Sequence, residues 1–117
     1  MRLILALFLL LPWIPADRHA AEIYRSTDQG RSWSRSGSGL PSSRINALTL
    51  AGSTVVAGTE SGIFLSLDSG KTWSGSAASL GAVVSFASLD GTLYAGTKQS
   101  GALASTDDGK TWKPVNQ

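Results

Sequence analysis

Three aspartates at near-constant spacing are the first candidates for chemistry. Asp28, Asp68 and Asp107 lie 40 and 39 residues apart, and each precedes a glycine by two residues and a tryptophan by five. Carboxylates could act as general acids or bases or bind calcium, and tryptophans could stack on sugar rings. The same residue types also suit a tight turn, because aspartate accepts hydrogen bonds from downstream amides and glycine adopts positive φ. We therefore expect the aspartates to stabilise turns and the tryptophans to pack in the core.

Composition excludes several classes of site. The chain has no cysteine, which excludes disulfides, thiolate zinc sites, cysteine nucleophiles and a lipoprotein anchor. The only histidine is His19, close to the N-terminus, so processing there would leave no imidazole for a Ser-His-Asp triad or a metal site. A net charge of +2 is too weak to favour nucleic-acid binding. We expect no catalytic residue, cofactor, metal ion or nucleic-acid partner.

The N-terminus has the pattern of an export signal. Met1 and Arg2 precede an unbroken apolar run, residues 3–11, followed by prolines and alanines. A helix of that length spans about 14–18 Å, whereas the hydrocarbon core of a bilayer is about 30 Å thick. The pattern predicts a signal peptide over residues 1–21, cleaved between Ala16 and Ala21, and a secreted or periplasmic protein without a stable membrane anchor. The alternatives are a buried strand and an uncleaved anchor.

An internal repeat predicts the fold. One eight-residue pattern occurs three times, and each copy is expected to form a β-hairpin whose tryptophan folds toward the next repeat. Beyond it, residues 54–59 match residues 92–97 at a spacing of 38. The four positions shared by all three copies are Ser26, Asp28, Gly30 and Trp33; Ser66, Asp68, Gly70 and Trp73; and Ser105, Asp107, Gly109 and Trp112.

Two complete units of four short strands follow from this repeat. The expected strands are 45–50, 54–59, 63–67 and 72–76 in the first unit, and 83–89, 92–97, 102–105 and 111–115 in the second. Four antiparallel strands in about 40 residues are typical of a β-propeller blade.

The chain divides into parts that do not close a propeller. Residues 1–21 are the signal peptide, 22–44 a half blade with the first repeat and a linker, and 45–82 and 83–117 one blade each. Propellers close with four to eight blades, so this all-β stack would expose apolar faces and strand edges at both ends. A truncated gene product, self-association into a ring and a stable open stack are the three explanations, and the first two are favoured.

The pattern Ser-x-Asp-x-Gly-x-Thr-Trp resembles the Asp-box, or bacterial neuraminidase repeat (BNR). The resemblance covers nearly all of residues 22–115, and such repeats occur in sialidase-like glycosidases, xyloglucanases, sortilin-like receptors and photosystem II assembly factor-like propellers. It implies that the boxes lie between the third and fourth strands of each blade, away from any active site. A sialidase would need an arginine cluster, a Tyr/Glu nucleophile and an acid. None can be carried over: Arg25, Arg31, Arg35 and Arg44 fall in the first third of the mature chain, and Tyr24 and Tyr94 lack a paired glutamate.

The sequence thus predicts an exported, non-catalytic segment that serves as a scaffold or binding module for protein or glycan, or assembles into a full propeller. The alternative is the N-terminal fragment of a sialidase-like or xyloglucanase-like glycoside hydrolase. A lectin-like homo-oligomer is a third hypothesis. The expected binding face lies opposite the boxes, where the turns between second and third strands meet the connections between blades. Its candidate residues are Arg44, Glu60, Lys98 and Gln99.

Overall fold

The computed structural model describes residues 4–8, 22–40, 44–76 and 81–115. These residues form eleven strands in three antiparallel sheets and include no helix. The first sheet contains β1 (Ile4–Phe8), β2 (Glu22–Ser26) and β3 (Ser34–Arg35). The middle sheet contains β4 (Ile45–Ala51), β5 (Thr54–Thr59), β6 (Gly62–Ser66) and β7 (Ser74–Gly75). The third contains β8 (Val83–Leu89), β9 (Thr92–Thr97), β10 (Ala102–Ser105) and β11 (Lys113–Pro114).

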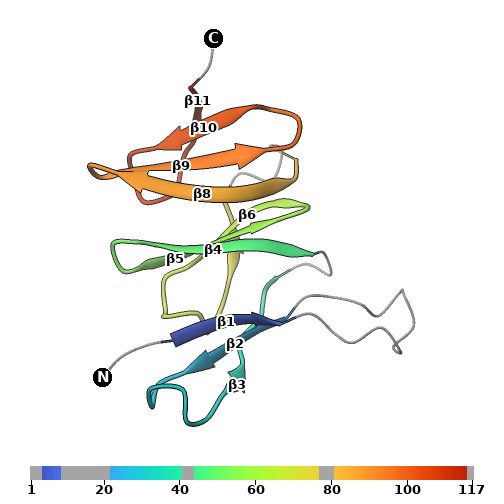
Figure 1. Ribbon diagram of the computed structural model, residues 1–117, viewed down its shortest axis with the longest axis vertical. Coiled ribbons are helices and arrows are strands. Elements are labelled where there is room, and N and C mark those ends of the chain that lie inside the picture. The colour runs from blue at the N-terminus through green and yellow to red at the C-terminus, as the bar shows by residue number, and fades with distance from the viewer. Residues whose placement is uncertain (1–3, 9–21, 41–43, 77–80, 116–117) are drawn as a thin grey trace.

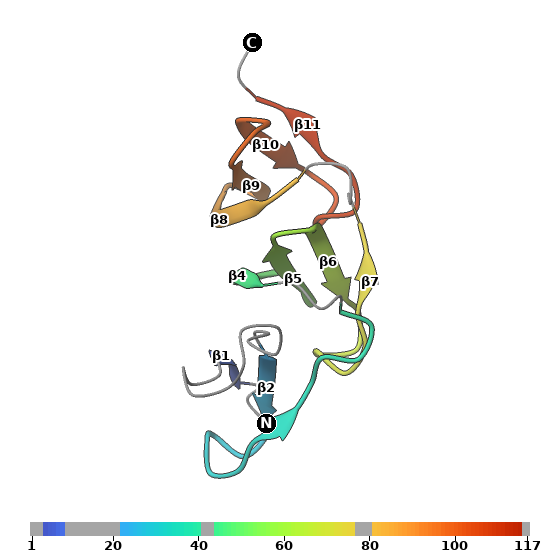
Figure 2. The same cartoon turned by 90° about the vertical axis from the view of Figure 1, so that its right-hand side faces the viewer.

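The three sheets stack one upon another along the longest axis of the molecule (Figure 1). Within the middle and third sheets, strands that follow one another in sequence also lie next to one another. Seen from the side, β7 and β11 lie along one flank of the stack and β4 and β8 along the other (Figure 2). The all-β repeat fold predicted from the sequence is confirmed, and the arrangement is consistent with part of a propeller.

The outer strands β7 and β11 are shorter than predicted. We expected strands over 72–76 and 111–115, but the sheet pairing covers only Ser74–Gly75 and Lys113–Pro114. The reason is that the backbone N–H groups of Thr72 and Thr111 donate to the aspartates of their own turns. An N–H group held in the turn in this way is not available to pair with the third strand of its own sheet, although Thr72 does form an isolated bridge to Ser38.

Both β4 and β8 contain an irregularity near their first residue. The pairing register shifts between Ile45 and Ala47 in β4, and between Val83 and Ser85 in β8. The extra residues, Asn46 and Val84, occupy equivalent places in the two sheets. A β-bulge of this kind redirects one side chain, and the alternation of residue types in the sequence did not predict it.

The apolar core lies between the sheets. One cluster fills the space between the first and middle sheets, and a second fills the space between the middle and third sheets. Strand β5 contributes to both, because successive side chains of a strand point to opposite faces; all six of its residues are buried. The first cluster comprises Ile23, Ile45, Val55, Ala57 and Trp73, and the second Val56, Ile63, Leu65, Val83, Leu93 and Ala95.

The tryptophans pack in the opposite direction to the one we expected. Trp73 of the middle sheet belongs to the cluster shared with the first sheet, and its Nε1 donates to the carbonyl of Ser36, 2.7 Å away. Trp112 of the third sheet packs against the cluster shared with the middle sheet. Each ring therefore lies over the preceding repeat, because the hairpin turns the last residue of the box back toward the preceding sheet.

Strand β1 lies within the predicted signal peptide. It pairs antiparallel with β2, and Ile4 stands opposite Ser26 in the same way that Val55 stands opposite Ser66 and Leu93 opposite Ser105. It therefore takes the place that β5 and β9 have in their sheets, so the first sheet has one strand more than residues 22–44 predict. Residues 1–3 and 9–21, with the expected cleavage sites, lie outside the described residues, and the signal peptide stays a prediction. Among the described residues, no helix has the length and apolar character needed to cross a bilayer.

Candidate functional site

Each box aspartate is engaged in its own turn. Asp68 Oδ1 accepts a hydrogen bond from the backbone N–H of Thr72 at 2.8 Å, and Oδ2 accepts one from its hydroxyl at 2.6 Å. The Ser66 hydroxyl donates to Asp68 and accepts from the N–H of Gly70, both at 2.8 Å. Gly70 has φ of 90°, as expected for the glycine of this turn. Asp28 and Asp107 make the same set of bonds in the other two boxes.

These hydrogen bonds stabilise the ionised form of the aspartates. The hydroxyl and N–H of Ser32, together with Ser26, lower the pKa of Asp28 to about 2. Thr111 and Ser105 lower the pKa of Asp107 to about 2 in the same way, and the pKa of Asp68 is also lowered, chiefly by Thr72. A carboxyl group that holds no proton near neutral pH is a poor general acid. The geometry supports the predicted turn-stabilising role.

Two of the predicted binding-face residues, Glu60 and Lys98, come into contact between the middle and third sheets. Lys98 Nζ lies 3.3 Å from Glu60 Oε1, and the Asn46 amide donates to Glu60 Oε2 at 2.7 Å and to the carbonyl of Val83 at 2.9 Å. Asn46, then Lys98 and the charge of Arg44 lower the pKa of Glu60. The bulge in β4 aims Asn46 at this cluster. The role of Asn46 was not predicted from the sequence, although a polar amide side chain in a largely apolar strand was a signal for it.

Gln99 lies beside this cluster, where its side-chain oxygen faces the backbone of Gly81. The turns that carry the cluster also pair with the connections between sheets: the N–H of Glu60 donates to the carbonyl of Arg44 at 2.9 Å, and that of Lys98 to Ala82 at 3.0 Å. The predicted grouping of these turns and connections at one edge is therefore observed.

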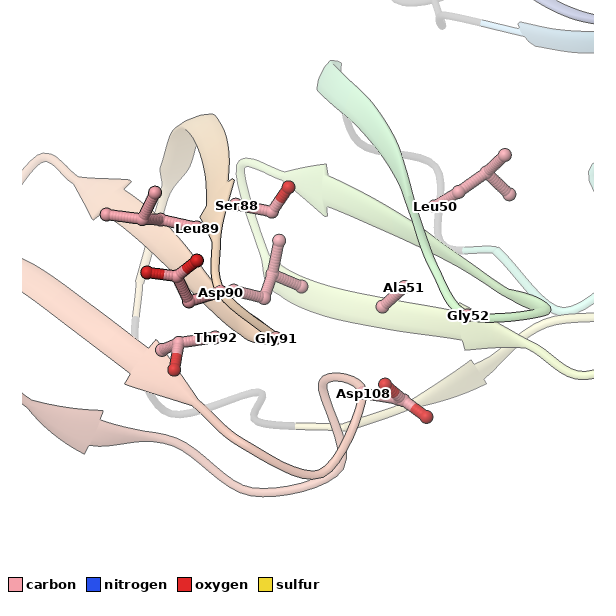
Figure 3. Close-up of a pocket in the computed structure, with 10 residues that line it drawn as sticks. Leu50, Ala51, Gly52, Ser88, Leu89, Asp90, Gly91, Thr92 and Asp108 are labelled. Atoms are coloured by element: carbon pink, nitrogen blue, oxygen red, sulfur yellow. The ribbon is translucent and has the colours of Figure 1, made fainter.

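A groove of about 210 Å³ opens at the opposite edge, beside the third box. Its walls are the turn between β4 and β5 and the turn between β8 and β9, and Asp108 of the box lies next to Gly52 (Figure 3). Leu50 and Leu89 border it with 59% and 64% of their surface exposed, and their side chains point away from each other on its two sides (Figure 3). The remaining lining residues are Ala51, Ser88, Asp90, Gly91, Thr92 and Leu93, so no basic side chain of the described residues lines the groove.

The sequence did not predict this groove. Its two turns belong to different repeats, and only the packing of the middle sheet on the third brings them together. The exposed leucines gave a signal, since each stands two residues before the glycine of a turn. The proximity of the two turns depends on the distance between sheets, which the repeat period does not specify.

The described residues bring together no other constellation of chemical interest. They contain no group of three or more His, Cys, Asp or Glu side chains that could hold a metal ion. None of the described arginines lies within β4 or β8: Arg25 is on β2, Arg31 in the first box turn, Arg35 on β3 and Arg44 just before β4.

Comparison with known proteins gives one family. Residues 24–35 and 103–114 match the BNR/Asp-box repeat, which covers the first and third boxes. The middle box, residues 66–73, has the same hydrogen bonds as the two that match. Searches of curated proteins and of solved structures found no significant match. The matches and the three equivalent turns together support a protein that carries BNR/Asp-box repeats.

Proposed function

We propose that this chain is an exported, non-catalytic binding module that takes up a segment of another protein in the groove between the β4–β5 and β8–β9 turns. The observation that carries the proposal is a concave site that holds the carboxylates of Asp90 and Asp108 and is flanked on its two sides by the largely exposed Leu50 and Leu89 (Figure 3). A concave site with exposed apolar side chains at its rim favours contact with a protein partner. The apolar N-terminal run supports export.

The charges of the groove indicate the chemistry of the partner. Asp90 and Asp108 line it and no basic residue of the described ranges does, so the groove is acidic although the whole chain has a net charge of +2. A lysine or arginine next to an apolar residue matches this surface, since its stem packs on leucine while its charge approaches the carboxylates. We therefore propose a basic–apolar segment as the ligand.

The polar cluster at the other edge is the weaker candidate for a binding surface. Glu60 is engaged by both Lys98 and Asn46, and these bonds join neighbouring sheets. A ligand there would have to replace contacts that the chain already makes. The exposed leucines beside the groove, in contrast, would gain contacts with a partner that extends past its rim.

The non-catalytic part of the proposal is supported by the state of the box aspartates. Their oxygens accept bonds from their own turns, which favour the ionised carboxylate over the protonated form that a general acid needs. The alternative is the N-terminal fragment of a sialidase-like or xyloglucanase-like glycoside hydrolase, and the full chain should not hydrolyse aryl sialosides or xyloglucan. Release of sugar above the rate without protein would overturn the non-catalytic assignment.

A displayed library of random peptides, selected on the full chain, tests the ligand class. We expect enrichment of peptides that carry lysine or arginine beside an apolar residue. Their binding should weaken at least tenfold in Leu89→Ser and measurably in Asp108→Asn, which keeps a side chain tolerant of the φ of 62° at this position. Leu67→Ser is the matched control, because Leu67 is 72% exposed but does not line the groove.

Two results would overturn this proposal. One is the absence of any enriched peptide while the same chain binds sugars on a glycan panel. The other is binding that Leu67→Ser weakens as much as Leu89→Ser does. Retained binding in Leu67→Ser with loss in Leu89→Ser would support the groove as the site.

A further inference from the structure

The contact between consecutive sheets is built twice from the same parts. In both cases the box of the later sheet packs on the earlier sheet, and at the first contact Trp73 of the middle box packs with Ile23 of β2. At the second contact, Gly109 approaches Leu65 and Val56 so closely that an added Cβ would lie 3.1 Å from Leu65 Cδ2 and 3.4 Å from Val56 Cγ2. Trp112 packs beside it, with its ring 6.3 Å from that of Phe86.

The first box lacks such a cover among the described residues. Trp33 makes the same local bond as the other box tryptophans, from Nε1 to the carbonyl of Gly30 at 3.0 Å. Its ring is nevertheless 38% exposed, whereas that of Trp73 is 5% exposed. Trp33 therefore already has the conformation in which the other box tryptophans pack, but the described part of this chain contains no sheet for it to cover.

The face of the third sheet that points away from the middle sheet is equivalent to the face of the middle sheet that the third box covers. Tyr94 and Ala104 stand opposite each other in β9 and β10, in the same register in which Val56 and Leu65 stand in β5 and β6. Val56 and Leu65 are buried under the third box, but Tyr94 and Ala104 are only partly buried. Alanine in place of leucine beside the tyrosine leaves space for an aromatic ring.

We propose that the occupant of this face is a second copy of the chain, whose first box packs on the third sheet with Trp33 over Tyr94 and Ala104. The internal repeat carries the inference, because the two ends of the stack are the two halves of a contact that the chain already makes twice within itself. The two surfaces differ from each other, so the contact is head-to-tail and leads to a ring or an open chain of copies. The inference does not depend on the proposed ligand groove.

One difference sets the strength of the contact between copies. The hydroxyls of Ser36 and Ser76 donate to the carbonyls of Gly70 and Gly109 in the following boxes. Val115 occupies the equivalent place after the third sheet. Its N–H donates to the carbonyl of Ala102, just as the N–H groups of Ser36 and Ser76 donate to Ile23 and Ile63 in their own sheets. The contact between copies therefore lacks this hydrogen bond, and we expect association that depends on concentration in the measurable range.

Sedimentation velocity of the full chain over a wide concentration range tests the inference. The parent should gain mass as its concentration rises, and Trp33→Ser and Ala104→Glu should each weaken the association at least tenfold. Lys113 lies opposite Ala104 across the strand pair, so a glutamate at position 104 has a partner within its own sheet. Leu67→Ser, an exposed change away from both ends, should associate as the parent does.

A mixture of the two variants distinguishes this arrangement from others. Trp33→Ser keeps an intact third sheet and Ala104→Glu keeps an intact first box, so an equal mixture should form a heterodimer and stop there. A parent that stays monomeric throughout, or variants that fold by circular dichroism but give no heterodimer, would overturn the inference. A parent that stays monomeric but still selects peptides would overturn the association of copies and leave the proposed function standing. A parent that associates but selects no peptide would overturn the proposed function and leave the association standing.

Discussion

The first and middle boxes contain the same motif in different surroundings. Both have the serine, aspartate and glycine hydrogen bonds of the turn, and in both the tryptophan Nε1 donates to the carbonyl of the box glycine. Trp73 nevertheless exposes 5% of its surface and Trp33 38%. The motif thus fixes the turn and the orientation of the ring, but the burial of the ring comes from the sheet before it.

Strands β5 and β9 show the same contrast. Their sequences, TVVAGT and TLYAGT, differ at two positions, and each strand pairs with a neighbour on both sides. All six residues of β5 are buried, whereas only Leu93 and Ala95 are buried in β9. Because the backbone pairing is matched, the difference in stability between these strands should come from the packing of their faces.

Trp73→Ala should have the largest effect on stability. The change removes a buried ring and its hydrogen bond to Ser36, and we expect it to lower the free energy of unfolding by about 3–5 kcal/mol. Trp33→Ala should cost no more than about half of that, since its ring is partly in water. Urea titration of both variants measures the difference, and equal losses would contradict the comparison.

Gly58→Ala should come next, because it places a methyl group between two sheets. Its Cβ would lie 2.7 Å from Val83 Cγ1, a buried and stiff side chain of the neighbouring sheet. We expect a loss of about 1–3 kcal/mol in urea titration. The matched change is Gly96→Ala, whose Cβ meets only the exposed Ser85 hydroxyl, which can rotate away. A larger loss for Gly96→Ala than for Gly58→Ala would show that the account of the two faces is wrong.

Asp68→Ala should lower the melting temperature by a smaller amount and change its dependence on pH. The folded-state pKa of the box aspartates lies below the ordinary value of 3.8, at about 2 for Asp28 and Asp107. Their stabilisation is therefore present above pH 4 and is lost as the pH falls from about 4 to about 2. In thermal melts between pH 7 and pH 2, the melting temperature of Asp68→Ala should fall less steeply with pH than that of the parent. The control Asp90→Asn, which is outside the boxes, should follow the parent. Parallel curves would contradict the turn-stabilising role.

Lys98→Ala should have the smallest effect. The ion pair with Glu60 is exposed, with 56% of the lysine side chain in water, and such pairs contribute little to stability. We expect a melting temperature within about 2 °C of the parent. A drop as large as that of Asp68→Ala would show that the cluster between the sheets is a structural element.

Much of the fold could be predicted because the sequence repeats it. The bounds of β5, β8, β9 and β10 agree with the expected ranges, since apolar runs between glycine turns recur at the same offsets from each box. The roles of the box serines, aspartates and glycines also follow from local hydrogen bonding, which needs only neighbouring residues.

The features that depend on contacts between sheets could not be predicted in the same way. The direction of Trp73, the bulge at Asn46 and the groove at Leu50 and Leu89 each depend on which face of one sheet meets the next. Sequence spacing shows that the repeats are neighbours, but it does not show which side of each repeat is covered. The exposure of Trp33 follows from the same cause.

Amide hydrogen exchange of the full chain tests the central claim most directly. It compares β5 and β9, which have matched sequences and matched pairing but differ in the burial of their faces. At concentrations below the onset of association, we predict that the amides of β5 exchange at least tenfold more slowly than the equivalent amides of β9. Equal protection of the two strands, or slower exchange in β9, would contradict the claim that burial between sheets holds this repeat structure together.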